Sequence, residues 1–153
     1  MSEIRHRVGI GAPVGEVYEA ISTAEGGRRW WTENVTGKGE PGVGAELTYE
    51  FGGPDRSVTM ALEELVPSSR VVWRCVQGPE EWVGTTFTFE LQGDDTDAET
   101  VVLFTNAGWR EPVEFMHHCT TKWGYFLLSL KHDLEGGKAT PWPHHEMISG
   151  WDR

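Results

Sequence analysis

The sequence predicts an α+β domain in which an antiparallel sheet of six or seven strands is covered by one long C-terminal helix. Three observations predict this class. Two short helical patterns follow a first strand, apolar and polar residues then alternate through most of residues 45–109, and a helical apolar stripe follows residue 111. A run of strands next to a helix that can cover them is typical of α+β chains. We expect a single domain over residues 1–153, with a tail from about residue 138.

The N-terminal part carries one strand signal and two helix signals. EIRHRVGI, residues 3–10, alternates apolar and charged side chains and predicts a half-buried strand. Pro13 suits a first helical turn, and apolar residues then recur at helical spacing up to Ile21. A second short helix is expected over residues 24–31, although its two glycines weaken it.

The middle of the chain has a period of two, which is typical of strands with one buried face. Short loops rich in glycine, proline or acidic residues separate the strands, as antiparallel hairpins require. One of them, residues 93–99, predicts a solvated turn because it lacks the glycine and distal glutamate of a calcium loop. The alternating segments are residues 45–51, 56–65, 70–76, 85–91 and 100–109.

The last regular element is a helix expected over residues 111–138, starting near Pro112 and stopping at Gly136 and Gly137. Its stripe would cover the apolar face of the sheet. The stripe consists of Met116, Cys119, Trp123, Phe126, Leu127, Leu130 and Leu134.

Composition excludes several classes of partner. Lys and Arg number 13 against 24 Asp and Glu, a net charge of −11, whereas nucleic acids and anionic membranes require dense basic patches. The chain start lacks the apolar region of a signal peptide, and no apolar run is long enough for membrane insertion. Cys75 and Cys119 lack framework spacing, so we expect reduced thiols in a cytoplasmic protein, with a single bridge between them left open.

Three motifs resemble a known family: APVGEVYEAISTAEGGRRWWTE (12–33), LFTNAGW (103–109) and HCTTKWGYFLLSLKHDLEGGKATPWP (118–143). Together with the strand spacing, they resemble the START-related (SRPBCC, Bet v 1-like) helix-grip superfamily, and within it the branch named after the activator of the heat-shock protein 90 ATPase. The resemblance implies a curved sheet wrapped around the last helix, with an apolar cavity between them entered near the short helices. It also implies lipid, hormone or polyketide ligands, and in a minority of members cyclase or hydratase activity.

Strand alternation and the helix stripe point one set of side chains toward this expected ligand cavity. An empty apolar void of about 300 Å³ would cost about 7 kcal/mol, a large share of a typical stability of about 5–15 kcal/mol. The set must therefore either pack as an ordinary core or surround a small cavity, water and polar groups, or a ligand, which the resemblance favours. The expected cavity residues are Trp31, Tyr49, Phe51, Met60, Trp73, Cys75, Phe87, Phe89, Phe104, Asn106, Met116, Cys119, Thr120 and Trp123.

The adjacent Trp30 and Trp31 end the second short helix. Neighbouring helical positions point about 100° apart, so one ring can face inward while the other borders the mouth of the cavity. We expect Trp31 to be the inward ring, with the reverse order left open. The alternative is that both rings only anchor the short helices to the sheet.

No catalytic residue, metal site or cofactor is assigned. His117 and His118 are helix neighbours that cannot converge on one ion, so solvated histidines are expected. His6 falls on the apolar face of its strand and predicts a core histidine. Cys119 would need an adjacent base to act as a nucleophile, and Asn106 can orient a carbonyl but cannot transfer a proton.

The leading hypothesis is therefore non-catalytic binding of a small hydrophobic or amphipathic molecule. An enzyme of polyketide-cyclase type would need a titrating group inside the same cavity. A protein-interaction or chaperone-regulating module would instead need a filled core and an exposed apolar patch. The apolar residues of the tail, such as Trp142 and Trp151, either pack back on the domain or cross to a second copy, which leaves a homodimer open.

Overall fold

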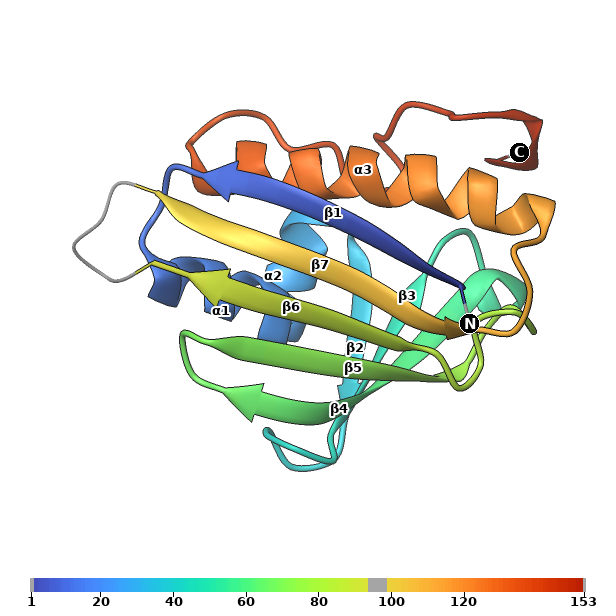
Figure 1. The fold of residues 1–153 in the computed structure, drawn as a ribbon, viewed down its shortest axis with the longest axis horizontal. Coiled ribbons are helices and arrows are strands. Elements are labelled where there is room, and N and C mark those ends of the chain that lie inside the picture. The colour runs from blue at the N-terminus through green and yellow to red at the C-terminus, as the bar shows by residue number, and fades with distance from the viewer. Residues whose placement is uncertain (1, 94–98, 153) are drawn as a thin grey trace.

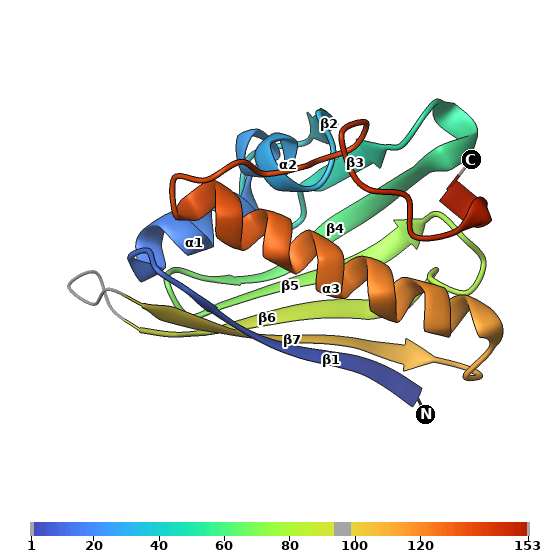
Figure 2. The same cartoon turned by 90° about the horizontal axis from the view of Figure 1, so that it is seen from above.

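The computed structural model describes residues 2–93 and 99–152, so most of the acidic turn predicted at residues 93–99 lies outside the described residues. It confirms the α+β class. Seven antiparallel strands form one curved sheet, and helix α3 lies across one of its faces (Figures 1 and 2). The elements are β1 (Ser2–Ile10), α1 (Val14–Ser22), α2 (Ala24–Trp30), β2 (Asn34–Lys38), β3 (Glu46–Glu50), η1 (Pro54–Arg56), β4 (Ser57–Val66), β5 (Arg70–Gln77), β6 (Thr86–Gln92), β7 (Thr100–Trp109), α3 (Glu114–Leu134) and η2 (Gly150–Asp152).

The sheet has the order β1-β7-β6-β5-β4-β3-β2, so each strand from β2 to β7 pairs with the next in sequence and β1 returns to pair with β7. Strand β4 has register irregularities between Thr59 and Met60 and between Leu62 and Glu64. Such bulges bend a strand and increase its twist. This curvature suits a sheet that wraps around a helix.

Helix α3 is shorter at both ends than the sequence predicts. Val113, directly after Pro112, is still extended, with φ −73° and ψ 170°. At the other end Gly136 has a φ of +79°, a left-handed conformation that favours glycine and ends the helix. Among the described residues, no helix is long and apolar enough to cross a membrane.

The C-terminal segment runs back along α3 instead of extending away from the domain (Figure 2). Its first part is joined to the end of α2: the Trp142 amide donates to the Trp31 carbonyl (2.9 Å), and the Glu33 amide donates to the Trp142 carbonyl (3.1 Å). The Tyr125 hydroxyl of α3 lies 2.6 Å from the Thr140 hydroxyl. The tail therefore forms part of the surface between α3, α2 and β3.

Candidate functional site

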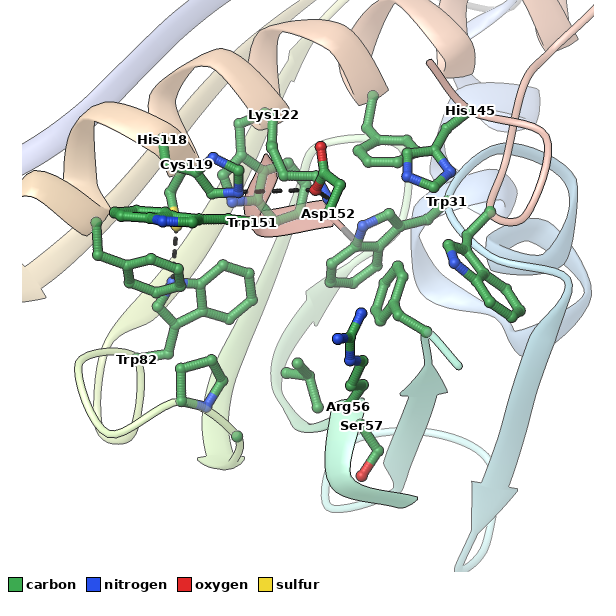
Figure 3. A pocket seen from close by; sticks show the side chains of 18 of the residues that line it. Trp31, Arg56, Ser57, Trp82, His118, Cys119, Lys122, His145, Trp151 and Asp152 are labelled. Carbon is green, nitrogen blue, oxygen red and sulfur yellow. Dashed lines mark hydrogen bonds and ion pairs between the residues drawn. The ribbon is translucent and has the colours of Figure 1, made fainter. Parts of the chain in front are cut away.

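A groove of about 560 Å³ lies beside the N-terminal half of α3, between the helix, the start of β4 and the C-terminal tail (Figure 3). This volume falls within the range of about 300–1,000 Å³ that is usual for small-molecule pockets. The aromatic, charged, imidazole and thiol side chains that line it are Trp31, Phe51, Asp55, Arg56, Trp82, Phe115, His118, Cys119, Lys122, Trp123, Phe126, Trp142, His145, Trp151 and Asp152.

Aromatic rings form the inner wall of the groove. The ring centroid of Trp31 lies 4.9 Å from that of Trp123 and 5.2 Å from that of Phe51, so α2, α3 and the end of β3 meet at one aromatic cluster. Trp82, in the loop between β5 and β6, donates its indole N–H to the Cys119 thiol at 3.4 Å. This wall offers flat apolar surfaces to a ligand.

Charged and imidazole side chains form the tail side of the groove. The Lys122 ammonium lies 2.7 Å from the Asp152 carboxylate, and the His118 Nε2 lies 3.8 Å from it. The Asp152 side chain is only 2% exposed. Burial alone would raise the pKa of Asp152, but Lys122 and the Ile148 amide, which donates to the carboxylate at 2.6 Å, hold that pKa below its usual range. Asp152 is therefore a buried, charged anchor of the tail.

Only some of the predicted cavity residues line this groove: Trp31, Phe51, Cys119 and Trp123. Most of the others pack as a filled core between the sheet and α3, because their rings and chains contact one another directly. Their role in ligand binding stays a prediction. These core residues are Tyr49, Met60, Trp73, Cys75, Phe87, Phe89 and Phe104.

Three predicted positions have other roles. Asn106 is fully buried, and its side-chain amide donates to the Thr86 carbonyl (3.0 Å) and accepts from the Trp109 indole (2.7 Å), so it is engaged in structural bonds. Met116 is half-buried against the core. Thr120, expected to face inward, is exposed, because α3 turns it to solvent and its hydroxyl bonds back to the Met116 carbonyl.

The groove and the Trp30 side chain both lie elsewhere than expected. It opens along the side between α3 and β4, bordered by the tail, and only Trp31 at the end of α2 represents the short helices there. Trp31 faces inward as predicted, but Trp30 does not border a mouth. Trp30 is fully buried and donates its indole N–H to the Ala20 carbonyl (2.8 Å), because α2 is enclosed between α1 and α3.

The prediction of solvated histidines is wrong for His118, whose side chain is 10% exposed. The tail covers it: Ser149 lies within hydrogen-bond distance of its Nδ1 (3.3 Å), and the Trp151 ring lies 5.2 Å away, centroid to centroid. His117, the residue directly before it, is exposed, as expected. A helix pattern alone cannot show that a distant tail returns to cover one face.

Loop and tail residues were missed for the same reason. Trp82 and Asp152 lie in segments without a regular period, so alternation could not assign them a direction. Arg56 is the first residue of the predicted alternating segment 56–65, but it lies in η1, just before β4 begins at Ser57. The apolar residues of the tail were the sequence signal that pointed to its packing against a protein surface. They did not identify which surface that is.

The two thiols have low reactivity at neutral pH. Burial raises the pKa of Cys75 to about 11 and that of Cys119 to about 12, so both are protonated at neutral pH and are poor nucleophiles. Both cysteines are free. Within residues 2–93 and 99–152, no group of three or more His, Cys, Asp or Glu side chains is arranged to hold a metal ion.

The architecture and the groove together define a helix-grip protein with a lateral pocket. The model of the family described as "Activator of Hsp90 ATPase homolog 1-like protein" matches residues 11–135. The chain therefore belongs to this family. No curated protein matches the sequence.

Solved structures show the same fold. Aha1 from Colwellia psychrerythraea, whose solution structure is a dimer, is 38% identical, with a TM-score of 0.78 over 91% of this chain and 100% of that chain. Protein SSP2350 from Staphylococcus saprophyticus is 20% identical, with a TM-score of 0.71 over 92% and 97% of the two chains. CalU16 from Micromonospora echinospora is 17% identical, with a TM-score of 0.67 over 90% and 76%. The last two likenesses concern the fold alone.

Three half-buried histidines predict a loss of stability in mild acid. Desolvation lowers the pKa of His6, His118 and His145 below the ordinary value of 6.5. The unfolded chain then binds more protons than the folded chain, so stability is complete above pH 6.5 and falls as the pH decreases through the folded-state values. We expect the urea midpoint to be lower at about pH 5.5 than at about pH 7.5.

This acid response is separable from that of the carboxylates, which titrate at lower pH. The His6 Nε2 is buried without a hydrogen-bond partner, and its ring lies 6.1 Å from that of Phe104. The variant His6→Gln should therefore lose less stability between the two pH values than the unmodified protein. Equal midpoints at both pH values in the unmodified protein would contradict the prediction.

Proposed function

We propose that the protein binds a small hydrophobic or amphipathic molecule in the groove beside α3 and performs no covalent chemistry on it. The observation that carries the proposal is the composition of the groove walls, aromatic on the inner side and charged on the tail side, around about 560 Å³. Ligand pockets typically combine such an apolar lining with a few polar groups that orient the ligand. The buried, free thiols support the further proposal of a reducing, cytoplasmic location.

Two related fluorescent probes test the binding proposal. 8-Anilinonaphthalene-1-sulfonate carries an anionic group, and N-phenyl-1-naphthylamine has the same aromatic body without it. We expect at least one probe to form a one-to-one complex in native mass spectrometry and to quench the tryptophan emission. Phe51→Ala should weaken binding about ten-fold, since it removes apolar contact area from the inner wall.

Leu128→Ala is the control for this test, because Leu128 is on α3 but 49% exposed and outside the groove. It should bind the probes like the unmodified protein. The proposal fails if neither probe binds, or if Phe51→Ala and Leu128→Ala bind equally well.

A second candidate function is an enzyme acting on a polyketide-like or aromatic substrate in the same groove. It is favoured by one observation: His118 and Asp152, which are titrating groups, face the groove 3.8 Å apart. To distinguish the two functions, the protein is incubated with an aromatic ketone that it binds, and the compound is then recovered and analysed by chromatography. Recovery of an unchanged compound supports binding alone, whereas a product that His118→Gln does not form supports catalysis.

We also propose a homodimer. Support comes from the 38% identical Aha1 of Colwellia psychrerythraea, which is described as a dimer. Sedimentation equilibrium should give about twice the mass of 17.2 kDa. A monomer at concentrations of about 100 μM would contradict this proposal.

A further inference from the structure

The last residues of the tail are held at the groove by the Asp152 side chain and by a longer contact of 3.3 Å between the Ser149 hydroxyl and His118 Nδ1. Residues 140–146 bond to α2 and α3 through backbone groups and the Tyr125 hydroxyl, which accepts from the Glu146 amide at 2.9 Å. Beyond them, Asp152 reaches α3 through the 2.7 Å bond from Lys122. Met147 and Trp151 are 51% and 53% exposed. The outer tail is therefore anchored at Asp152 with little apolar burial.

This anchor places an aromatic ring and a carboxylate side by side against the groove. The Trp151 ring lies 6.3 Å from that of Phe115 and 5.2 Å from that of His118, centroid to centroid, while the neighbouring Asp152 carboxylate accepts from Lys122. Figure 3 shows both side chains above the inner wall, with Arg56 pointing toward the same space from η1, directly before β4. The tail thus presents the two chemical features of an aromatic acid.

The charges of the groove depend on this carboxylate. The permanently charged side chains that line it are Arg56 and Lys122 on the positive side and Asp55 and Asp152 on the negative side. If Asp152 left Lys122, the Lys122 ammonium would lose the carboxylate that it contacts at 2.7 Å. The Lys122 side chain is 25% exposed, so another anion could then reach it, and such a partner stabilises a half-buried charge more than a fully exposed one.

We propose that the groove selects aromatic molecules carrying an anionic group, and that this group replaces Asp152 on Lys122. This inference rests on the proposed ligand-binding function and adds the chemical class of the ligand. In the unliganded chain the Trp151–Asp152 pair holds the site, so the tail competes with the ligand. The outer tail would leave Lys122 when an aromatic anion binds, while residues 140–146 stay in place.

The test compares the anionic probe, 8-anilinonaphthalene-1-sulfonate, with the neutral N-phenyl-1-naphthylamine. We expect the unmodified protein to bind the anionic probe more tightly. In Lys122→Met the ratio of anionic to neutral affinity should fall about ten-fold, since a charge-assisted bond is lost. In Asp152→Asn the same ratio should rise several-fold, because the amide competes less well for Lys122 than the carboxylate does.

Lys131→Met is the matched control. Lys131 also lies on α3 and also pairs with a carboxylate at 2.7 Å, that of Glu135, but it is outside the groove. The ratio should not change in this variant, and circular dichroism should show all three variants folded.

The inference is overturned if Lys122→Met binds the anionic probe as tightly as the unmodified protein, or if Asp152→Asn lowers the ratio of anionic to neutral affinity. Equal binding of both probes to the unmodified protein overturns it too and leaves the groove as a general apolar site. Absence of all binding would reject the proposed function itself.

Discussion

Replacing Trp123 by alanine is expected to lower the free energy of unfolding by about 3–5 kcal/mol, the usual cost of deleting a large aromatic side chain from a core. Trp123 is 2% exposed and stands at the centre of the aromatic cluster. Its ring centroid lies 4.7 Å from that of Phe104 and 5.5 Å from that of Phe87, so it joins α3 to strands β6 and β7. Against a total of about 5–15 kcal/mol, this loss is severe. Urea unfolding followed by far-UV circular dichroism measures it without relying on tryptophan emission.

Trp151→Ala is the matched control for this experiment, because the same side chain is removed from a position that is 53% exposed. We expect it to cost less than about 1 kcal/mol, as surface substitutions usually do. Equal losses in the two variants would show that Trp123 does not hold the core together in the way described.

The sheet and the long helix could be predicted from the sequence because their burial has a period. In β5, for example, alternate residues such as Trp73 and Cys75 are buried, while Arg74 between them reaches solvent and pairs with Glu63. A period of two leaves only one way to bury the apolar set. The fold class and the two short helices followed from such patterns, whereas the pattern did not decide which of Trp30 and Trp31 lines the groove.

The groove could not be predicted in the same way, because pattern shows which face is buried but not how completely that face is filled. Tyr49 and Phe89 have the alternation of cavity residues, yet both are buried in a packed core. A protein interior close-packs its side chains wherever it can, since voids are costly. The space that remains lies where the tail, a loop and α3 meet. Asp152 and Lys122 are 30 residues apart, and nothing in either segment alone indicates that they pair.

Gly26→Ala is expected to destabilise the protein by about 3 kcal/mol, although alanine favours a helix over glycine by about 1 kcal/mol. A Cβ atom at Gly26 would lie 2.5 Å from the Cα and the carbonyl oxygen of Ala20, which belong to the backbone of α1 and cannot rotate away. Helices α1 and α2 would have to separate. The Trp30 indole, which donates to that same Ala20 carbonyl, would move with α2.

Gly37→Ala separates this steric effect from the general effect of changing a glycine. A Cβ at Gly37 in β2 would meet only the end of the Leu47 side chain, at an ordinary contact distance of 3.6 Å. We expect its free energy of unfolding to stay within about 0.5 kcal/mol of the unmodified protein. Because Trp31 directly follows α2, a displaced α2 should also shift the inner wall of the groove, so Gly26→Ala should weaken probe binding while Gly37→Ala leaves it intact. A Gly26→Ala protein as stable as Gly37→Ala would mean that α1 and α2 are not in the close contact described.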